Sequence, residues 1–269
     1  GNLSLDLGQY ARARAYYEES LVVTRQLKYQ QGIANSLLNL SQASFYQGDL
    51  QHAIALQEES LAIHRQIGNQ VGIALALHNL ASMPEQQGDY DQAAALAEDS
   101  LARYKQLGDS LGMALALHNL ALLAHRQRAY ERAKQLFDEC QAIYGKLGAK
   151  NDLARALNDL GELVADQGDY ECARVQYEES LRLAAELGDR RCQAAALNNL
   201  GRLAHRAGDE ERATALCSKS LSLRRDLGDK RGIVKALESL GQITPQQEHL
   251  SMQACRADTI LWMEVYSSH

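Results

Sequence analysis

The sequence contains little of what marks many other classes of protein. Its 269 residues include two prolines, one tryptophan and two phenylalanines. So few helix breakers, in a chain rich in Ala, Leu, Gln and Arg, favour an all-α fold. No apolar run approaches the roughly 20 residues of a membrane span. The formal net charge of −6 gives no general attraction to polyanions. We therefore expect no membrane and no nucleic acid among the direct partners.

The cysteines do not form a pattern of paired or metal-binding residues. Five are present and none belongs to a C-x-x-C pair: Cys140, Cys172, Cys192, Cys217 and Cys255. An odd number without a framework argues against structural disulfides and favours a reducing compartment, which predicts a cytoplasmic protein. Cys140 and Cys217 fall at core positions of the repeat described below, so we interpret them as small buried hydrophobic residues.

The motifs of common enzyme classes are also missing. The chain has no G-x-x-x-x-G-K-[ST] or G-x-G-x-x-G segment, and no H-E-x-x-H segment for a metal. His118 and His125 lie seven residues apart on one helix face, but a metal site needs further ligands nearby. Carboxylate pairs such as Glu58-Glu59 and Glu178-Glu179 recur every forty residues, which is typical of architecture and not of one catalytic pair. We predict no catalytic, cofactor-binding or metal-binding residues and no enzyme activity.

A repeat of forty residues runs through the chain without insertion. Its central leucine recurs at Leu40, Leu80, Leu120, Leu160, Leu200 and Leu240. The residue before it is Asn39, Asn79, Asn119, Asp159, Asn199 or Ser239. A glycine recurs eight residues after the leucine, as in Gly48 and Gly168, with Arg128 in its place once. A fixed register of this kind predicts identical units that each pack on their neighbours.

Each unit reads as two helices joined by a tight turn. Leu157, Leu160 and Val164 share one helical stripe, and Gly168-Asp169 ends it before a second stripe begins at Tyr170. Glycine can take the left-handed conformation that ends a helix, and the aspartate after it can cap the next one. At position 128 an arginine must either accept that strained conformation or loosen the turn.

The order Leu-Gly, Gly-x-Tyr, Ala and an aromatic four residues later, as in Leu160-Gly161, Gly168-Asp169-Tyr170, Ala173 and Tyr177, resembles the tetratricopeptide repeat. The resemblance implies an all-α, right-handed α–α superhelix of helix–turn–helix units. Forty residues exceed the usual 34, which predicts helices of about 18 residues. Long repeats of this kind are similar to those of kinesin light chains, Pins-type adaptors and bacterial signalling ATPases and transcriptional regulators. The phrase LGDKRGIVKALESLG resembles the bacterial group most.

We divide the chain into one solenoid domain, residues 1–269, with irregular ends. The chain begins within a first helix, so we expect an excerpt of a longer protein. The last first helix is expected to reach Thr244, and the residues from Pro245 onward to form an irregular cap. The expected units are a truncated repeat at 1–28, regular repeats at 29–68, 69–108, 109–148, 149–188 and 189–228, and a last first helix with the cap at 229–269.

The resemblance also implies a peptide-binding groove on the concave face, lined by the first helices. Its expected residues are Asn39, Tyr46, His78, Asn79, His118, Asn119, His125, Arg126, Arg155, Asn158, Asn198, Asn199, Arg202, Arg206 and Lys235. The N-terminal positions, which also include Gln42 and Phe45, are mostly apolar or neutral, whereas the C-terminal positions are charged.

Two features of this groove have two interpretations each. An asparagine amide both donates and accepts, so the Asn39, Asn79, Asn119 and Asn199 series can hold an extended backbone. It can equally bond the adjacent helix, and Asp159 interrupts the series. The basic group Arg202, Arg206 and Lys235 can bind a ligand carboxylate, or it can pair internally with Glu162, Asp166 or Glu238.

The sequence therefore predicts a non-enzymatic scaffold that binds a protein or peptide segment in its groove, without cofactors. One alternative is a sensor or oligomerisation arm of a bacterial signalling ATPase or transcriptional regulator. Another is homo-oligomerisation through the uncapped ends, because an open solenoid leaves apolar surface at its termini.

Overall fold

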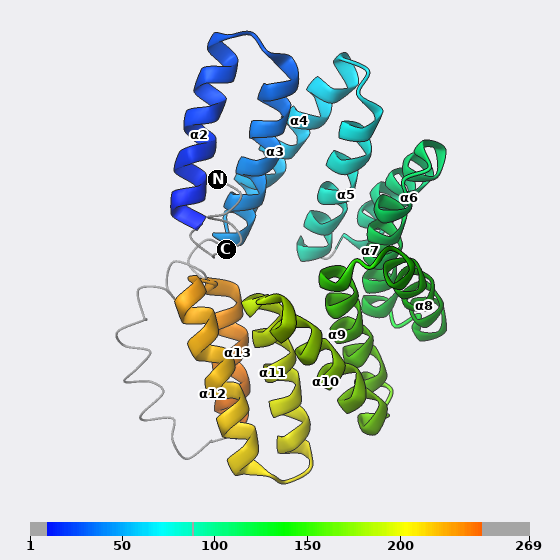
Figure 1. Cartoon of the computed structure of the whole chain (residues 1–269), viewed down its shortest axis with the longest axis vertical. Coiled ribbons are helices and arrows are strands. Elements are labelled where there is room, and N and C mark those ends of the chain that lie inside the picture. Colours follow the sequence, from blue (N-terminus) through cyan, green and yellow to red (C-terminus); the bar gives the residue numbers. More distant parts are fainter. Residues whose placement is uncertain (1–9, 88, 244–269) are drawn as a thin grey trace.

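A computed structural model describes residues 10–87 and 89–243 of the chain (Figure 1). Over these residues the chain forms twelve α-helices and no strand, as the composition and periodicity predict. The helices are α2 (Tyr10–Gln26), α3 (Gln30–Tyr46), α4 (Leu50–Gln66), α5 (Gln70–Gln87), α6 (Tyr90–Leu107), α7 (Ser110–Arg126), α8 (Tyr130–Leu147), α9 (Lys150–Asp166), α10 (Tyr170–Leu187), α11 (Arg190–Arg206), α12 (Glu210–Leu227) and α13 (Lys230–Ile243). None of the helices described is long and apolar enough to cross a membrane.

Each helix packs against the next one in the chain, and the stack of helices curves. The odd-numbered helices are the first helices of the repeats and the even-numbered ones are the second helices. First helices of consecutive repeats, from α5 to α13, also contact one another, which places them on the inner side of the curve. The array turns so far that α2 and α3 lie opposite α11, α12 and α13 (Figure 1).

The turns have the predicted conformation. Eight glycines between helices have positive φ, from Gly48 at +88° to Gly228 at +65°. Arg128 takes the same conformation at φ +61°. The turn therefore keeps its geometry, and the backbone of Arg128 carries the strain of a left-handed conformation in a residue with a Cβ. Lys28 does the same at φ +53°.

The predicted aspartate caps are also confirmed. Asp49, Asp89, Asp169 and Asp209 accept a hydrogen bond from a backbone N–H in the first turn of a second helix. Asp109, Asp189 and Asp229 do the same for a first helix. These bonds satisfy donors that a helix start leaves without a partner.

The core repeats with the sequence. The second-helix alanines Ala53, Ala93, Ala133, Ala173 and Ala213 are all fully buried. Serine hydroxyls in four second helices donate to a carbonyl of the first helix in the same repeat, at 2.6–3.0 Å. These pairs, which the sequence analysis did not predict, are Ser60–Ala34, Ser100–Ala74, Ser180–Ala154 and Ser220–Ala194.

The cysteines that the structure describes are free thiols. Cys140, Cys192 and Cys217 are buried, and burial raises the pKa of these thiols to about 12, 11 and 11. They therefore act as small apolar residues, as expected for Cys140 and Cys217. Cys255 and the expected cap from Pro245 onward lie outside the described residues, as does the beginning of the repeat at 1–28.

Candidate functional site

A ladder of side-chain hydrogen bonds runs along the inner face from one first helix to the next. It joins the residue two before the central leucine to the residue one before the next central leucine, 41 positions later. The distances are 2.8–3.2 Å. The four pairs are His78–Asn119, His118–Asp159, Asn158–Asn199 and Asn198–Ser239.

This ladder decides between the two interpretations for Asn119 and Asn199. The amides of Asn119, Asn198 and Asn199 donate to the neighbouring first helix. Asp159 does not interrupt the series, because its carboxylate lies 2.8 Å from Nε2 of His118. The side chain of Asn39, by contrast, has no hydrogen-bond partner in the described part of the chain. The ladder therefore connects α5 to α13 and stops short of α3.

Two of the predicted groove histidines, His78 and His118, belong to the ladder, and a third, His125, pairs with a carboxylate of the next first helix. Burial, and then the charges of His118 and Arg155, lower the pKa of His78 to about 4. Its Nδ1 lies 3.2 Å from the Asn119 amide nitrogen, a contact in which a neutral ring accepts. His125 lies two helical turns after His118 on α7, and its Nε2 is 2.9 Å from Oδ2 of Asp166 on α9. Among the residues described, no three His, Cys, Asp or Glu side chains lie together as metal ligands would.

The predicted basic group lines a recess of about 190 Å³ at the C-terminal part of the groove. Lys235 Nζ lies 3.0 Å from Glu162 Oε1, which also accepts from Asn199 at 2.9 Å. Burial alone raises the pKa of Glu162, but Lys235, Asn199 and Arg202 together hold it below its usual value. One of the three cations is thus paired internally.

The other two cations differ from Lys235. Arg206 donates to the hydroxyl of Tyr170 at 2.9 Å and lies 5.3 Å from the centre of that ring. Arg202 has no hydrogen bond or ion pair with a described residue. The recess holds four cationic side chains against the two carboxylates of Glu162 and Asp166, and so carries a positive surplus: Arg126, Arg202, Arg206 and Lys235.

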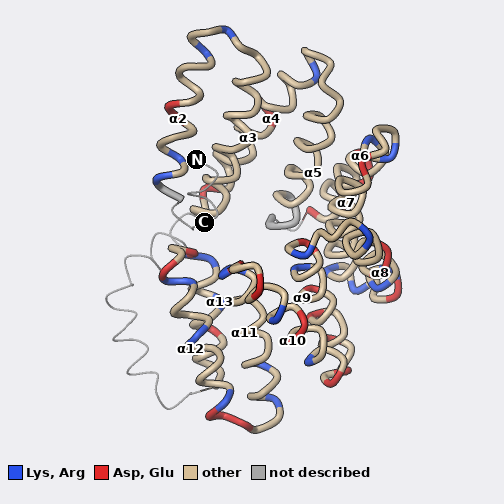
Figure 2. The backbone as a smooth tube through the Cα atoms, viewed as in Figure 1, with Lys and Arg blue, Asp and Glu red and all other residues tan. Residues whose placement is uncertain are grey.

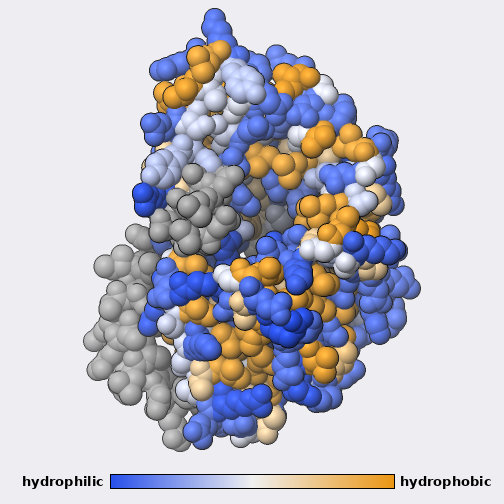
Figure 3. All heavy atoms as spheres, in the orientation of Figure 1, coloured by the Kyte–Doolittle hydropathy of each residue, from blue (hydrophilic) through white to orange (hydrophobic). Residues whose placement is uncertain are grey.

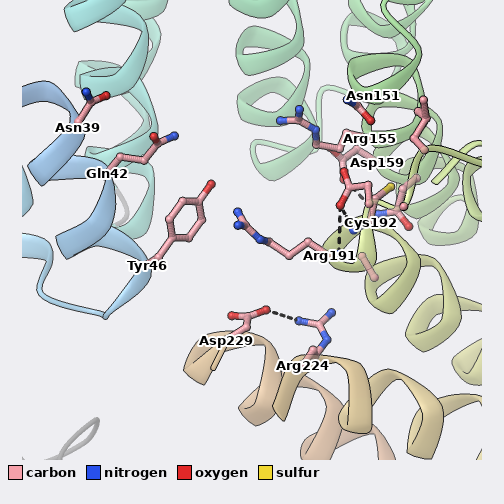
Figure 4. Close-up of a pocket in the computed structure, with 15 residues that line it drawn as sticks. Asn39, Gln42, Tyr46, Asn151, Arg155, Asp159, Arg191, Cys192, Arg224 and Asp229 are labelled. Carbon is pink, nitrogen blue, oxygen red and sulfur yellow. Dashed lines mark hydrogen bonds and ion pairs between the residues drawn. The ribbon is translucent and has the colours of Figure 1, made fainter. Parts of the chain in front are cut away.

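A larger cavity of about 800 Å³ lies between α3 and the C-terminal helices (Figure 4). Asn39, Gln42 and Tyr46 of α3 form one wall. The opposite wall comes from α9, α11, α12 and the turn between α12 and α13: Asn151, Arg155, Asn158, Asp159, Arg191, Arg224 and Asp229. Figure 3 shows the surface hollowed between the N-terminal and C-terminal helices, with apolar and polar side chains around the hollow.

The cavity is lined by three arginines and three aspartates, and several of them have ion-pair partners in the protein. Asp229 pairs with Arg224 at 3.3 Å, and Arg155 pairs with Asp152 at 3.0 Å. Asn39, Gln42 and Asn151 have side-chain amides without a hydrogen bond to a described residue. Figure 2 shows the wider trend, with few charged residues along α3 and α5 and many along α9, α11 and α13.

The predicted groove residues thus separate into three places. The cavity contains Asn39, Tyr46, Arg155 and Asn158; the recess contains His125, Arg126, Asn199, Arg202, Arg206 and Lys235; and the ladder contains His78, His118, Asn119 and Asn198. Asn79 belongs to none of them. The sequence analysis missed Asn151 and Arg191, because both lie in the first turn of a helix, outside the positions that the family resemblance supplies.

Comparisons with known proteins agree with this geometry. The sequence profile of the tetratricopeptide repeat matches residues 1–66, 72–146 and 152–226. A comparison with curated proteins gave no significant match. Among solved structures, BtubC (BKLC) from P. vanneervenii is similar with a TM-score of 0.61 and 23% identity, over 81% of this chain and 92% of that one.

Two Rap proteins share the fold. A Rap protein complexed with Competence and Sporulation Factor has a TM-score of 0.68 and 15% identity, over 91% of this chain and 72% of that one. The apo form of RapI has a TM-score of 0.57 and 14% identity, over 90% and 97%. The repeat is in general a non-catalytic fold for protein interaction, so the array is a protein-interaction scaffold. The chain belongs to the tetratricopeptide repeat family.

Proposed function

We propose that the array binds an extended segment of another protein in its concave groove. The observation that supports this most is the position of the polar groove side chains that lack hydrogen-bond partners, because they lie near the two ends of the groove. Between α5 and α13 each ladder residue has at least one hydrogen-bond partner within the protein. The side chains of Asn39 and Gln42 near one end and of Arg202 near the other have no hydrogen-bond partner among the described residues. A ligand that spans the groove would supply hydrogen-bond partners to the side chains at both ends.

The two ends would recognise different parts of the segment. Amides without partners can donate to and accept from a peptide main chain. The recess has a surplus of two positive charges by count, and the free fork of Arg202 suits a carboxylate. The proposed ligand is therefore uncharged near α3 and acidic near α11.

The Rap protein complexed with Competence and Sporulation Factor supports the proposal in a general way, because it has a similar fold and holds another molecule. A bound segment would equally suit a sensor arm of a bacterial cytoplasmic signalling protein, the first alternative from the sequence. The alternative of self-association through the ends involves residues outside those described.

The test selects peptides from a randomised twelve-residue library and then measures the affinity of the best one by fluorescence polarisation. We expect acidic residues near one end of the selected peptides. The Arg202→Glu/Arg206→Glu variant should bind at least tenfold more weakly, which corresponds to about 1.4 kcal/mol. Arg132→Glu, on the exposed face of α8, is the matched control and should bind like the wild type. Unchanged affinity in the double variant would contradict the proposal.

A further inference from the structure

Two aromatic side chains at the end of α3 meet two arginines of the C-terminal repeats. The guanidinium of Arg191, in α11, lies 4.6 Å from the centre of the Tyr46 ring. That of Arg231, in α13, lies 4.8 Å from the centre of the Phe45 ring. Both distances are within the range of a cation–π interaction. Figure 4 shows Tyr46 and Arg191 pointing toward each other across the cavity.

These four residues do not follow from the repeat. At the positions of Phe45 and Tyr46, the later repeats have Glu85-Gln86, His125-Arg126, Ala165-Asp166 and His205-Arg206. At the position of Arg191 and Arg231, the earlier repeats have Gln31, Val71, Leu111 and Asn151. The aromatic pair thus occurs in one repeat and the arginines in two others, about 145 and 186 positions later. The repeat itself therefore does not account for the match between them.

The packing around the two rings favours a stable contact between the N-terminal and C-terminal repeats. The two rings are arranged edge to face, 5.9 Å apart, so each fixes the other's orientation. Both lie half-buried and pack on the core clusters of α2 to α6. Because the rings are held by the N-terminal repeats and the guanidiniums by the C-terminal ones, the contacts join the two ends of the array.

We propose that Phe45, Tyr46, Arg191 and Arg231 form a clasp that closes the array and completes the cavity. Without it, Asn39 and Gln42 on one wall and Asn151 and Arg155 on the other would be free to separate. The closed cavity takes the main chain of an extended, uncharged segment, because its charges are balanced and its side chains without partners are amides. That part of the inference rests on the proposed function, whereas the clasp itself does not.

Closure and binding should then favour each other. A solenoid whose repeats contact only their neighbours changes curvature at small cost per repeat. A segment that contacts both walls binds the closed form better than the open form, and it can shift the equilibrium only by that difference. Loss of the clasp should therefore expand the ligand-free protein and weaken the binding of a segment.

Small-angle X-ray scattering of the full chain tests the clasp without any ligand. We expect a larger radius of gyration for Arg191→Gln/Arg231→Gln and for Phe45→Leu/Tyr46→Leu. Arg12→Gln is the matched control, because Arg12 lies over Tyr16 within one helix, at 5.7 Å, and should leave the radius unchanged. A wild-type radius in the arginine double variant, with native circular dichroism, would overturn the clasp. Expansion in the aromatic variant alone would also overturn it.

The selected peptide from the groove experiment then tests the coupling. Weaker binding to the arginine double variant than to the wild type is expected, and equal binding would overturn the link between closure and the site. If no peptide is selected, the proposed function fails, while the scattering result on the clasp stands unaffected.

Discussion

At the scale of single residues, the repeat identifies equivalent positions on the first helices but does not give the partners of the side chains there. Asn119 and Asn199 occupy the predicted positions, yet their amides bond residues of the preceding first helix. The reason is geometric. Neighbouring first helices are offset by one residue, so a side chain meets the one 41 positions away and not the one 40 away. Periodicity reveals equivalent positions, and it does not reveal this offset.

His78 should make the stability of the protein sensitive to acid. Burial, then His118 and Arg155, lower its pKa to about 4 from 6.5. The unfolded chain therefore takes up this proton first, and stability is lost as the pH falls from 6.5 toward 4. The contribution is at most about 1.4 kcal/mol per pH unit.

The His78→Gln variant should lose less free energy of unfolding than the wild type between pH 7 and 4.5, as measured by urea denaturation at each pH. His52→Gln, on the outer helix α4, serves as the control and should keep the acid response of the wild type. Parallel pH profiles for His78→Gln and the wild type would refute this role of His78.

At the scale of secondary-structure elements, the sequence predicts nearly everything that the structure describes. Helix ends follow from glycine and aspartate, and even Arg128 keeps the conformation of the glycine it replaces. What the sequence analysis missed is a hydrogen bond between the two helices of a repeat. Ser180 and its equivalents donate to carbonyls of the first helix, a bond that a stripe of small residues does not reveal.

The glycine after the central leucine should matter only where a large side chain faces it. A Cβ at Gly161 would lie 2.5 Å from the Tyr177 ring, whereas no atom of the described residues lies within 4 Å of a Cβ at the equivalent Gly241. Gly161→Ala should therefore destabilise the protein by about 1–3 kcal/mol through overpacking. Gly241→Ala should stabilise it by up to about 1 kcal/mol through helix propensity.

Thermal and urea unfolding of the two glycine variants measure the contrast directly. Adding Tyr177→Leu to Gly161→Ala should relieve the crowding, so the effects of the two substitutions should not add. Equal effects at both glycines would show that propensity, and not the Tyr177 ring, decides the cost.

At the scale of the whole molecule, the sequence predicts a superhelix but not where its ends meet. The curvature of the array depends on a small rotation between consecutive repeats. This rotation accumulates over the array, and no single motif in the sequence reveals it. The cavity between α3 and α11 and the contact of Tyr46 with Arg191 follow from that sum. The sequence could have suggested the clasp only through its departures from the repeat.

Glu162 should couple three repeats through its charge, because it lies on α9, accepts from Asn199 on α11 and pairs with Lys235 on α13. Although burial raises the pKa of Glu162, these partners and Arg202 hold it below its usual value of 4.5. The unfolded carboxylate takes up its proton first, so the stability it contributes is present above pH 4.5 and is lost as the pH falls through the folded pKa.

Glu162→Gln should therefore be less stable than the wild type at pH 7, and the difference in free energy of unfolding should shrink as the pH falls below 4.5. Glu238→Gln, an exposed carboxylate on α13, should show no such difference at either pH. A constant deficit of the Glu162→Gln variant across the pH range would mean that packing, and not the charge, joins these helices.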